Sequence, residues 1–113
     1  MPTDPNHNEP ISEQFRITAK AWVEADEAAS LLEETKSAVV SEMITKIIGY
    51  NLGMPFNKAE LSAKSSPEYR DFIHEMVRLR SRANLLKVKM EFLRMKFQEQ
   101  SSAEATARAE RRL

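Results

Sequence analysis

The placement of glycine and proline is the feature of this sequence that most constrains its fold. The two glycines of the chain, Gly49 and Gly53, lie close together. The stretches 11–48 and 68–113 on either side contain neither glycine nor proline. Because a sheet needs several turns, and turns are rich in these two residues, the pattern argues against a sheet and predicts two long helices joined at one place.

The length and composition predict one small domain with a modest core. The chain has 113 residues, of which 42% are apolar and 30% are charged. A chain of this size buries a smaller fraction of its surface than a large domain does, so we expect it to complete its core by self-association. The absence of cysteine excludes a disulfide framework, a thiolate nucleophile and a cysteine-type zinc site.

The first helix is predicted to span residues 12–48. The polar segment 1–10, which holds three of the five prolines, is expected to be a flexible arm. Ser12 is suited to cap the helix, and Gly49 can take the left-handed conformation that ends helices. The apolar residues in between are spaced three, four or seven apart, which places them on one face. They are Ile11, Phe15, Trp22, Ala25, Ala29, Leu32, Val39, Met43 and Ile47.

The connection, residues 49–66, is expected to contain a short helix. Asn57 followed by Glu60 is close to a capping box, which favours a helix from about Lys58 to Ala63. We expect the apolar residues of the connection to plug the end of the hairpin that the long helices form. These residues are Tyr50, Leu52, Met54, Phe56 and Leu61.

The second long helix is predicted to span residues 67–112. Ser66 is a good N-cap, and Pro67 suits the first helical position. Apolar residues then follow at alternating spacings of three and four, the heptad pattern that keeps one seam against a partner helix. They are Tyr69, Phe72, Met76, Leu79, Ala83, Leu86, Met90, Leu93 and Phe97.

Together these elements predict an all-α fold, a long antiparallel helical hairpin with a short connecting helix, as a single domain over residues 11–113. Some apolar residues of the second helix fall outside its seam, and a hairpin cannot cover two faces of one helix. We therefore expect a dimeric bundle, a homodimer that associates through Ile73, Val77 and Met95. In the alternative, the connection folds back and covers Ile73 and Val77.

The net charge of zero hides a strong asymmetry. Residues 1–48 contain four basic and nine acidic residues, whereas residues 78–96 contain seven basic residues and one acidic residue. One interpretation is structural, with the basic second helix facing the acidic first helix. The other is functional, with lysine and arginine binding the phosphates of DNA or RNA. The residues of this second interpretation are Arg78, Arg82, Lys87, Lys89, Arg94 and Lys96.

The sequence offers no constellation for catalysis or for binding a metal or cofactor. His7 lies in the predicted arm, His74 lies off the seam, and neither belongs to a pair with metal-ligand spacing. Glycine-rich phosphate loops and nucleophile motifs are absent. No run approaches the roughly 18 apolar residues that cross a bilayer, and the start of the chain lacks a secretory signal. We expect a cytoplasmic protein that is not an enzyme, uses no cofactor and has no membrane partner.

Two stretches carry a resemblance to a known class of proteins. One has the sequence AWVEADEAA at 21–29 and continues with LEETK at 32–36, and the other is EATARAERRL at 104–113. Together with the heptads between them, they resemble small helical-hairpin proteins encoded in the early regions of tailed bacteriophages. The resemblance implies a phage origin, expression in a bacterial cytoplasm and neighbours that act on DNA. Proteins of this kind include anti-CRISPR inhibitors and accessory factors for replication or recombination.

Three functional hypotheses follow. In the first, an interaction protein docks on a protein of a nucleic-acid-processing or host-defence system and modulates it, with an acidic face of the first helix meeting a basic groove. The second is direct binding of DNA or RNA by the basic helix. The third is a virion or scaffold component that assembles to high order. The acidic face consists of Glu24, Asp26, Glu27, Glu33 and Glu34.

Overall fold

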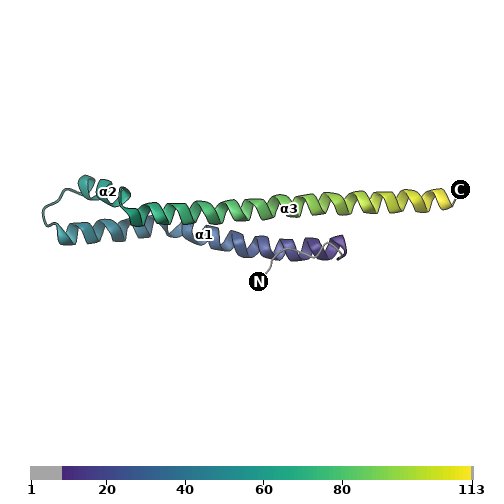
Figure 1. Cartoon of the computed structure of the whole chain (residues 1–113), viewed down its shortest axis with the longest axis horizontal. Helices are drawn as coiled ribbons and strands as arrows, with labels where there is room; N and C mark the ends of the chain where they lie inside the picture. The colour runs from purple at the N-terminus through teal and green to yellow at the C-terminus, as the bar shows by residue number, and fades with distance from the viewer. Residues whose placement is uncertain (1–8, 113) are drawn as a thin grey trace. The chain divides into compact units, whose positions relative to one another are not determined.

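The computed structural model describes residues 9–112, and every regular element in them is helical. The elements are α1 at Ile11–Tyr50, α2 at Phe56–Lys64 and α3 at Pro67–Arg111 (Figure 1). The all-α fold with a short connecting helix is thereby confirmed. Of the predicted arm, residues 1–8 with His7 lie outside the described part, and Glu9 and Pro10 directly precede α1.

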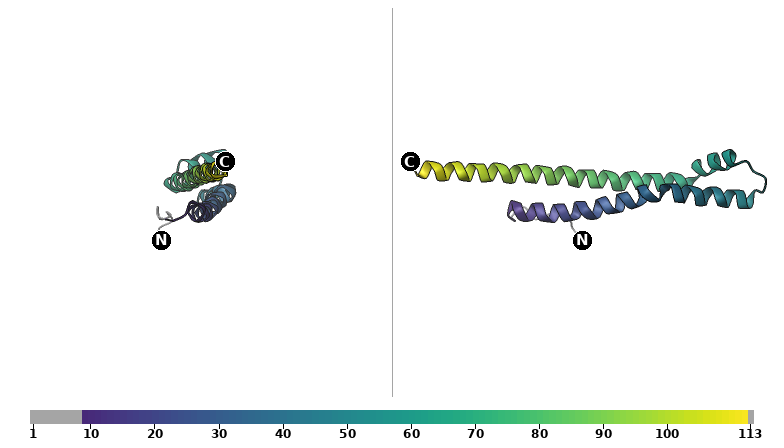
Figure 2. Two further views of the ribbon diagram at one scale, coloured as in Figure 1. Left: turned by 90° about the vertical axis from the view of Figure 1, so that its right-hand side faces the viewer. Right: turned by 180° about the vertical axis from the view of Figure 1, so that it is seen from behind.

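Contacts divide the chain into two compact units, where the sequence predicted one domain. Unit 1 combines the described residues up to Ala25 with those from Arg82 onward, and unit 2 spans Asp26–Ser81. Within each unit, a portion of α1 lies beside a portion of α3 and runs antiparallel to it (Figures 1 and 2). The antiparallel pairing of the two long helices is therefore present in both units.

The start of α1 differs from the prediction, because Ser12 does not cap it. The Pro10 carbonyl accepts hydrogen bonds from the backbone N–H groups of Glu13 and Gln14, both at 3.0 Å. Pro10 therefore occupies the N-cap position, whose carbonyl accepts the first helical bond. The Gln14 side-chain amide also donates to the Glu9 carbonyl at 2.7 Å.

The predicted end of α1 at Gly49 is wrong. The helix continues through Gly49 to Tyr50, and the Asn51 N–H still donates to the Ile47 carbonyl at 3.0 Å. The left-handed conformation occurs at Gly53 instead, with φ at +91°. Glycine is needed where the backbone reverses, and the reversal toward α2 comes after Tyr50.

The start of α2 also differs from the prediction. The helix begins at Phe56, and Pro55 takes the cap position without a side-chain hydrogen bond. The Pro55 carbonyl accepts the N–H groups of Lys58 and Ala59, both at 3.1 Å. Asn57 therefore lies inside the first turn and does not cap it, because the extended backbone of Pro55 already sets the helix start.

The predicted start of α3 is confirmed. The Ser66 hydroxyl accepts the Tyr69 N–H at 3.2 Å, and the Ser66 carbonyl accepts the Arg70 N–H at 3.2 Å. Pro67 is the first helical residue, where its missing N–H removes no helical bond. The same hydroxyl donates to the Ala63 carbonyl at 2.6 Å and so ties the end of α2 to the start of α3.

Unit 2 has a small core in which α2 packs on the C-terminal half of α1. Ile44, Ala59 and Ala63 form its buried centre. The partly buried residues packed against them are Val40, Met43, Ile47, Ile48 and Met54. Because α2 packs on α1, Val77 stays 54% exposed and Ile73 is half-buried. The alternative in which the connection covers both Ile73 and Val77 is therefore wrong, because Val77 is exposed.

The predicted seam of α3 is confirmed over most of its length. Ala83, Leu86 and Leu93 are buried, and the other seam residues are half-buried except Phe97, which is 47% exposed. On α1, the predicted apolar face is buried at Ala29 and half-buried elsewhere. The sequence missed Thr18, which is 1% exposed and whose hydroxyl has no hydrogen-bond partner within residues 9–112.

Candidate interaction surfaces

A bidentate ion pair joins α1 to α3 within unit 2. Arg80 Nε donates to Glu33 Oε2 at 2.9 Å, and Arg80 Nη2 donates to Glu33 Oε1 at 2.7 Å. Arg80 Nη1 donates to Asp26 Oδ1 at 2.7 Å, and Nη2 also reaches the Ser30 hydroxyl at 3.2 Å. At Arg80, the basic helix α3 therefore faces the acidic helix α1. This agrees with the structural interpretation of the charge asymmetry.

The contact at Arg80 shifts the pKa values of the paired groups. Hydrogen bonding from Arg80 lowers the pKa of Glu33, although partial desolvation acts in the opposite direction. The bonds to Glu33 and then to Asp26 raise the pKa of Arg80, so the guanidinium stays charged. These charges neutralise one another inside unit 2 and select how α1 pairs with α3.

The predicted acidic face is divided between two sides of α1. Asp26 and Glu33 are engaged by Arg80 and belong to the pairing of the helices. The other three members, Glu24, Glu27 and Glu34, are exposed. Within the predicted acidic face, these three exposed side chains are the members that Arg80 does not engage.

The predicted nucleic-acid-binding residues have different surroundings. Arg78 donates two hydrogen bonds to the Glu75 carboxylate one turn away. Arg82 and Lys89 both interact with other groups of the chain. All three basic residues of the row therefore already interact with other groups of the chain. The row consists of Arg78, Arg82 and Lys89.

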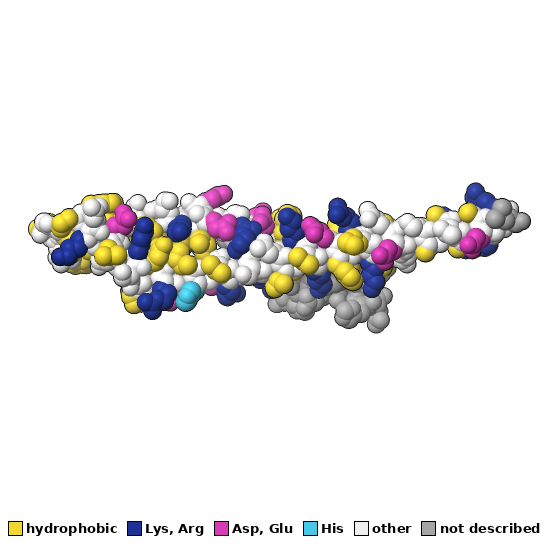
Figure 3. Space-filling model, turned by 90° about the horizontal axis from the view of Figure 1, so that it is seen from above, with side chains coloured by type: hydrophobic (Ala, Val, Ile, Leu, Met, Phe, Trp, Pro, Cys, Tyr) yellow, Lys and Arg dark blue, Asp and Glu magenta, His cyan; other side chains and the backbone are white. Residues whose placement is uncertain are grey.

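The remaining basic residues of the set are exposed. Lys87 and Arg94 are exposed, and the structure gives them no ion pair within residues 9–112. Lys96 Nζ lies 5.7 Å from the centroid of the Phe92 ring, a cation–π distance. Figure 3 shows one face of the molecule, where lysine and arginine side chains are interspersed with apolar and acidic side chains.

A second apolar row lies on the side of α3 turned away from its buried seam. It consists of Leu85, Val88, Phe92 and Met95, which we call the outer seam, with exposed fractions of 72%, 64%, 58% and 57%. The spacings of three, four and three keep these residues within an arc of about 80° at 100° per residue. That arc lies roughly opposite the buried Ala83 and Leu86. All four residues belong to unit 1.

The sequence only partly indicates the outer seam. Leu85, Val88, Phe92 and Met95 all lie outside the main heptad pattern, and of these four the sequence analysis assigned only Met95 to an interface. The signal that finds the whole row is a second alternation of three and four, superposed on the first. Because two such patterns overlap on α3, periodicity alone does not say which of them α1 covers.

A second exposed apolar group surrounds the turn before α2 in unit 2. It consists of Tyr50, Leu52, Phe56 and Leu61, which we call the apolar end, with exposed fractions of 88%, 90%, 57% and 69%. The expectation that these residues plug the hairpin is wrong, although Met54 does join the core. The side of α2 that packs on α1 carries Ala59 and Ala63, whose small size allows close approach, while Phe56 and Leu61 stay exposed.

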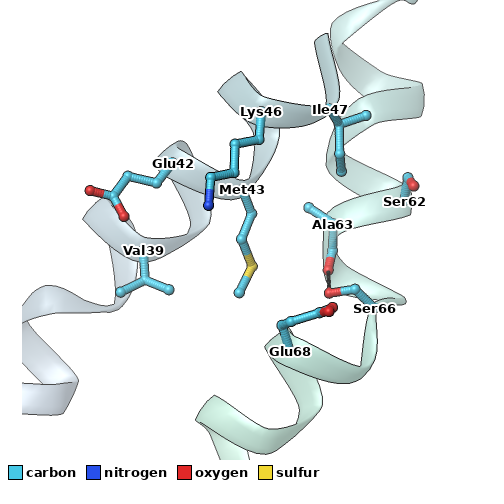
Figure 4. A pocket seen from close by; sticks show the side chains of 9 residues that line it. All are labelled: Val39, Glu42, Met43, Lys46, Ile47, Ser62, Ala63, Ser66 and Glu68. Carbon is cyan, nitrogen blue, oxygen red and sulfur yellow. Dashed lines mark hydrogen bonds between the residues drawn. The ribbon is translucent and has the colours of Figure 1, made fainter. Parts of the chain in front are cut away.

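A shallow cleft of about 480 Å³ runs between α1 and the junction of α2 with α3 in unit 2 (Figure 4). Val39, Met43 and Ile47 line its α1 side. Ser62, Ala63, Ser66 and Glu68 line the other side, and Glu42 and Lys46 complete the lining. In Figure 4 the Ser66 hydroxyl is directed at the Ala63 carbonyl, so it serves the helix cap. Val39, Met43 and Ile47 therefore give the cleft an apolar wall on α1.

The described residues contain no group of three or more His, Asp or Glu side chains that could hold a metal ion. None of their helices is both long and apolar enough to cross a membrane. The chain matches no protein-family model, and neither the curated proteins nor the solved structures gave a match. The exposed surfaces of the structure are therefore the basis for proposing a function.

Proposed function

We propose that this chain is a non-enzymatic interaction protein, a helical module that binds another protein. The observation that supports this function is the exposure of large apolar side chains at the outer seam and the apolar end. A chain with few large buried residues leaves these side chains in water, and contiguous exposed apolar rows are typical of interaction sites. Both groups stand on or beside helices, so they are held in fixed positions.

The particular role we propose is modulation of a nucleic-acid-processing or host-defence protein in a bacterial cytoplasm, as an anti-CRISPR-like inhibitor or as a replication or recombination accessory factor. The resemblance to phage helical-hairpin proteins supports this role. The exposed acidic residues Glu24, Glu27 and Glu34 would suit a basic groove on such a partner. Asp26 and Glu33 are excluded from this surface because Arg80 engages them.

Direct nucleic-acid binding is the second candidate function. The exposed side chains of Lys87, Arg94 and Lys96 favour it. The engagement of Arg78 with Glu75 and of Arg80 with α1 weighs against it, because these cations are already neutralised. Phosphate binding would weaken steeply as salt rises, whereas apolar binding would not.

Homodimer formation through Ile73, Val77 and Met95, and high-order assembly as a scaffold, stay predictions. Val77 and Met95 are more than half exposed, which suits an interface, while Ile73 is already half-buried. Light scattering after size-exclusion chromatography separates the cases. A closed dimer gives one mass at all concentrations, and a scaffold gives masses that grow with concentration.

The proposed function is tested with the chain as cross-linked bait in a bacterial lysate, beside two variant baits. One variant carries Glu24→Lys, Glu27→Lys and Glu34→Lys, and the other carries Tyr50→Ser and Leu52→Ser. A protein that the wild type retains and one variant bait loses supports the function and identifies the surface that binds it.

In parallel, fluorescence anisotropy with labelled DNA and RNA at low salt tests direct nucleic-acid binding, the second candidate function. If the lysate yields no specific protein while nucleic acid binds with a steep salt dependence, the first proposal is replaced by the second.

A further inference from the structure

The last part of α3 continues beyond the start of α1. Within unit 1, α3 extends past the first residues of α1 in both side views (Figures 1 and 2). We call residues 98–111 the α3 extension, which is about 21 Å long at 1.5 Å per residue. All of its residues are exposed except Ala107, which is half-buried. The α3 extension is therefore a helix that no described segment of the chain buries.

The α3 extension gains little stability from the rest of the chain. Isolated helices shorter than about 12–15 residues are marginal in water, because most helix stability in proteins comes from the packing of one face. The extension carries no apolar side chain larger than alanine. A segment that fits it must therefore offer complementary charges, since an apolar stripe would find nothing to pack against.

Charged residues take over the seam positions of α3 in the extension. With the same alternation of three and four, Phe97 is followed by Gln100, Glu104, Ala107 and Arg111. Arg108 lies one turn after Glu104 and borders the same face. Along this face the carboxylate therefore comes first and the two arginines follow it.

A hollow of about 390 Å³ lies in unit 1, where α1 begins beside the α3 extension. One carboxylate oxygen there, Glu9 Oε2, is buried and has no hydrogen-bond partner in the described part of the chain. A buried acceptor without a donor is unfavourable. Glu104 lines the same hollow, so its two carboxylates favour a cationic occupant. The full lining consists of Glu9, Pro10, Ile11, Ser12, Phe97, Gln100, Ser101 and Glu104.

The α3 extension of a second copy carries cations at a suitable spacing. When two extensions run antiparallel and overlap along their whole length, position 100 of one faces position 111 of the other, and position 104 faces position 107. Arg108 and Arg111 of each copy then lie on either side of Glu104 of the other. Among residues 9–112, these three side chains form no ion pair within one copy. Charges that are unpaired in one chain thus become paired between two chains.

We propose that two copies of the chain associate through their α3 extensions, side by side and antiparallel. Each copy would place Arg108 and Arg111 at the hollow of the other, where the guanidinium groups meet the carboxylates of Glu9 and Glu104. The arrangement has two-fold symmetry, so every contact occurs twice. It goes beyond the proposed function and locates self-association away from Ile73, Val77 and Met95.

The mixed charges of this face select a second copy over other occupants. Nucleic acid is uniformly negative, and its phosphates would meet the carboxylates of Glu9 and Glu104 as well as the arginines. A uniformly basic or uniformly acidic helix would complement only half of the face. Like charges placed opposite one another disfavour an interface. The chain itself supplies both halves in the required order.

Sedimentation equilibrium of the full chain, from about 10 μM to about 1 mM, measures the association. At low salt, the mass should approach twice that of one chain as the concentration rises. The dimer should dissociate when salt is added, because exposed ion pairs are screened. A monomer at every concentration would overturn the proposal. A dimer that is indifferent to salt would overturn it too, and would point to the apolar residues Ile73, Val77 and Met95 instead.

Charge-reversed variants locate the interface. One variant carries Glu9→Arg and Glu104→Arg, and the other carries Arg108→Glu and Arg111→Glu. Each variant alone should dimerise about tenfold more weakly or worse, because like charges then face one another. An equimolar mixture of the two should recover the dimer, which variants that had only lost their fold could not do. Wild-type dimerisation in each variant alone, or no recovery in the mixture, would contradict the proposed pairing.

The matched control is the double variant Lys46→Glu and Lys58→Glu. It changes the net charge as much as the reversal of the two arginines does, but at exposed lysines of unit 2. Its association should equal that of the wild type. If the control loses the dimer to the same degree, net charge governs the association and the α3 extension is not the interface.

Discussion

The Arg80 guanidinium on α3 donates two parallel hydrogen bonds to the Glu33 carboxylate on α1, at 2.9 and 2.7 Å. A planar guanidinium matches a carboxylate in this way, and a lysine ammonium cannot. Asp26 accepts a third bond from the same arginine at 2.7 Å. Within unit 2, this contact joins residues 47 positions apart and fixes which turn of α1 lies against α3.

The Arg80–Glu33 pair predicts a loss of stability in acid. Since Arg80 lowers the pKa of Glu33 below its ordinary 4.5, the contact contributes fully above that value and is lost as the pH falls through the lowered pKa. Glu33→Gln should therefore flatten the acid limb of a stability–pH curve, measured by urea unfolding from about pH 6 to about pH 3. Glu34→Gln, at its exposed neighbour, is the control and should leave the wild-type limb in place. An unchanged limb in Glu33→Gln would show that the pair does not contribute.

The neighbours Leu85 and Leu86 predict opposite responses to the same substitution. Leu86 is 8% exposed and Leu85 is 72% exposed. Leu86→Ala should lower the free energy of unfolding by about 2–5 kcal/mol, because it opens a cavity in the seam. Leu85→Ala should change it by less than about 0.5 kcal/mol. Urea unfolding followed by circular dichroism measures both, and similar losses in the two variants would mean that the outer seam is buried in solution.

The two glycines also predict opposite responses. Gly53 has φ at +91°, where an L side chain is strained, so Gly53→Ala should destabilise the chain by about 1 kcal/mol or more. Gly49 lies within α1, and a Cβ there meets open space. Gly49→Ala should therefore stabilise the chain by about 0.5–1 kcal/mol. Thermal unfolding of both variants checks the signs, and a loss of stability in Gly49→Ala would place the helix end at Gly49 after all.

Two serines that look alike in the sequence predict different effects on stability. Ser66 accepts the Tyr69 N–H, so Ser66→Ala should lower the free energy of unfolding by about 1 kcal/mol. At Ser12 the cap position belongs to Pro10, and Ser12→Ala should change stability by less than about 0.5 kcal/mol. Chemical unfolding of the two variants side by side makes the comparison. A larger effect at Ser12 than at Ser66 would contradict the observed caps.

The sequence was most informative where a local pattern sets a local structure. The heptad spacing that contains Ala83, Leu86 and Leu93 predicted the buried face of α3, because periodicity is a property of a single helix. The start of α3 was predicted for the same reason, since Ser66 caps amides only three residues away. The N-caps of α1 and α2 were predicted wrongly, because Pro10 and Pro55 occupy these positions and their carbonyls accept the first helical hydrogen bonds.

The sequence by itself therefore determined the three helices, the buried seam of α3 and the absence of strands in the described chain. The tertiary structure decided which charges are neutralised and which apolar rows stay in water. Arg80 finds Glu33 and Asp26 only once α1 lies against α3, while α2 packs through Ala59 and Ala63 and leaves Leu61 outside. The spacing of one helix fixes where its side chains point, but whether a face is covered depends on a second segment distant in the sequence.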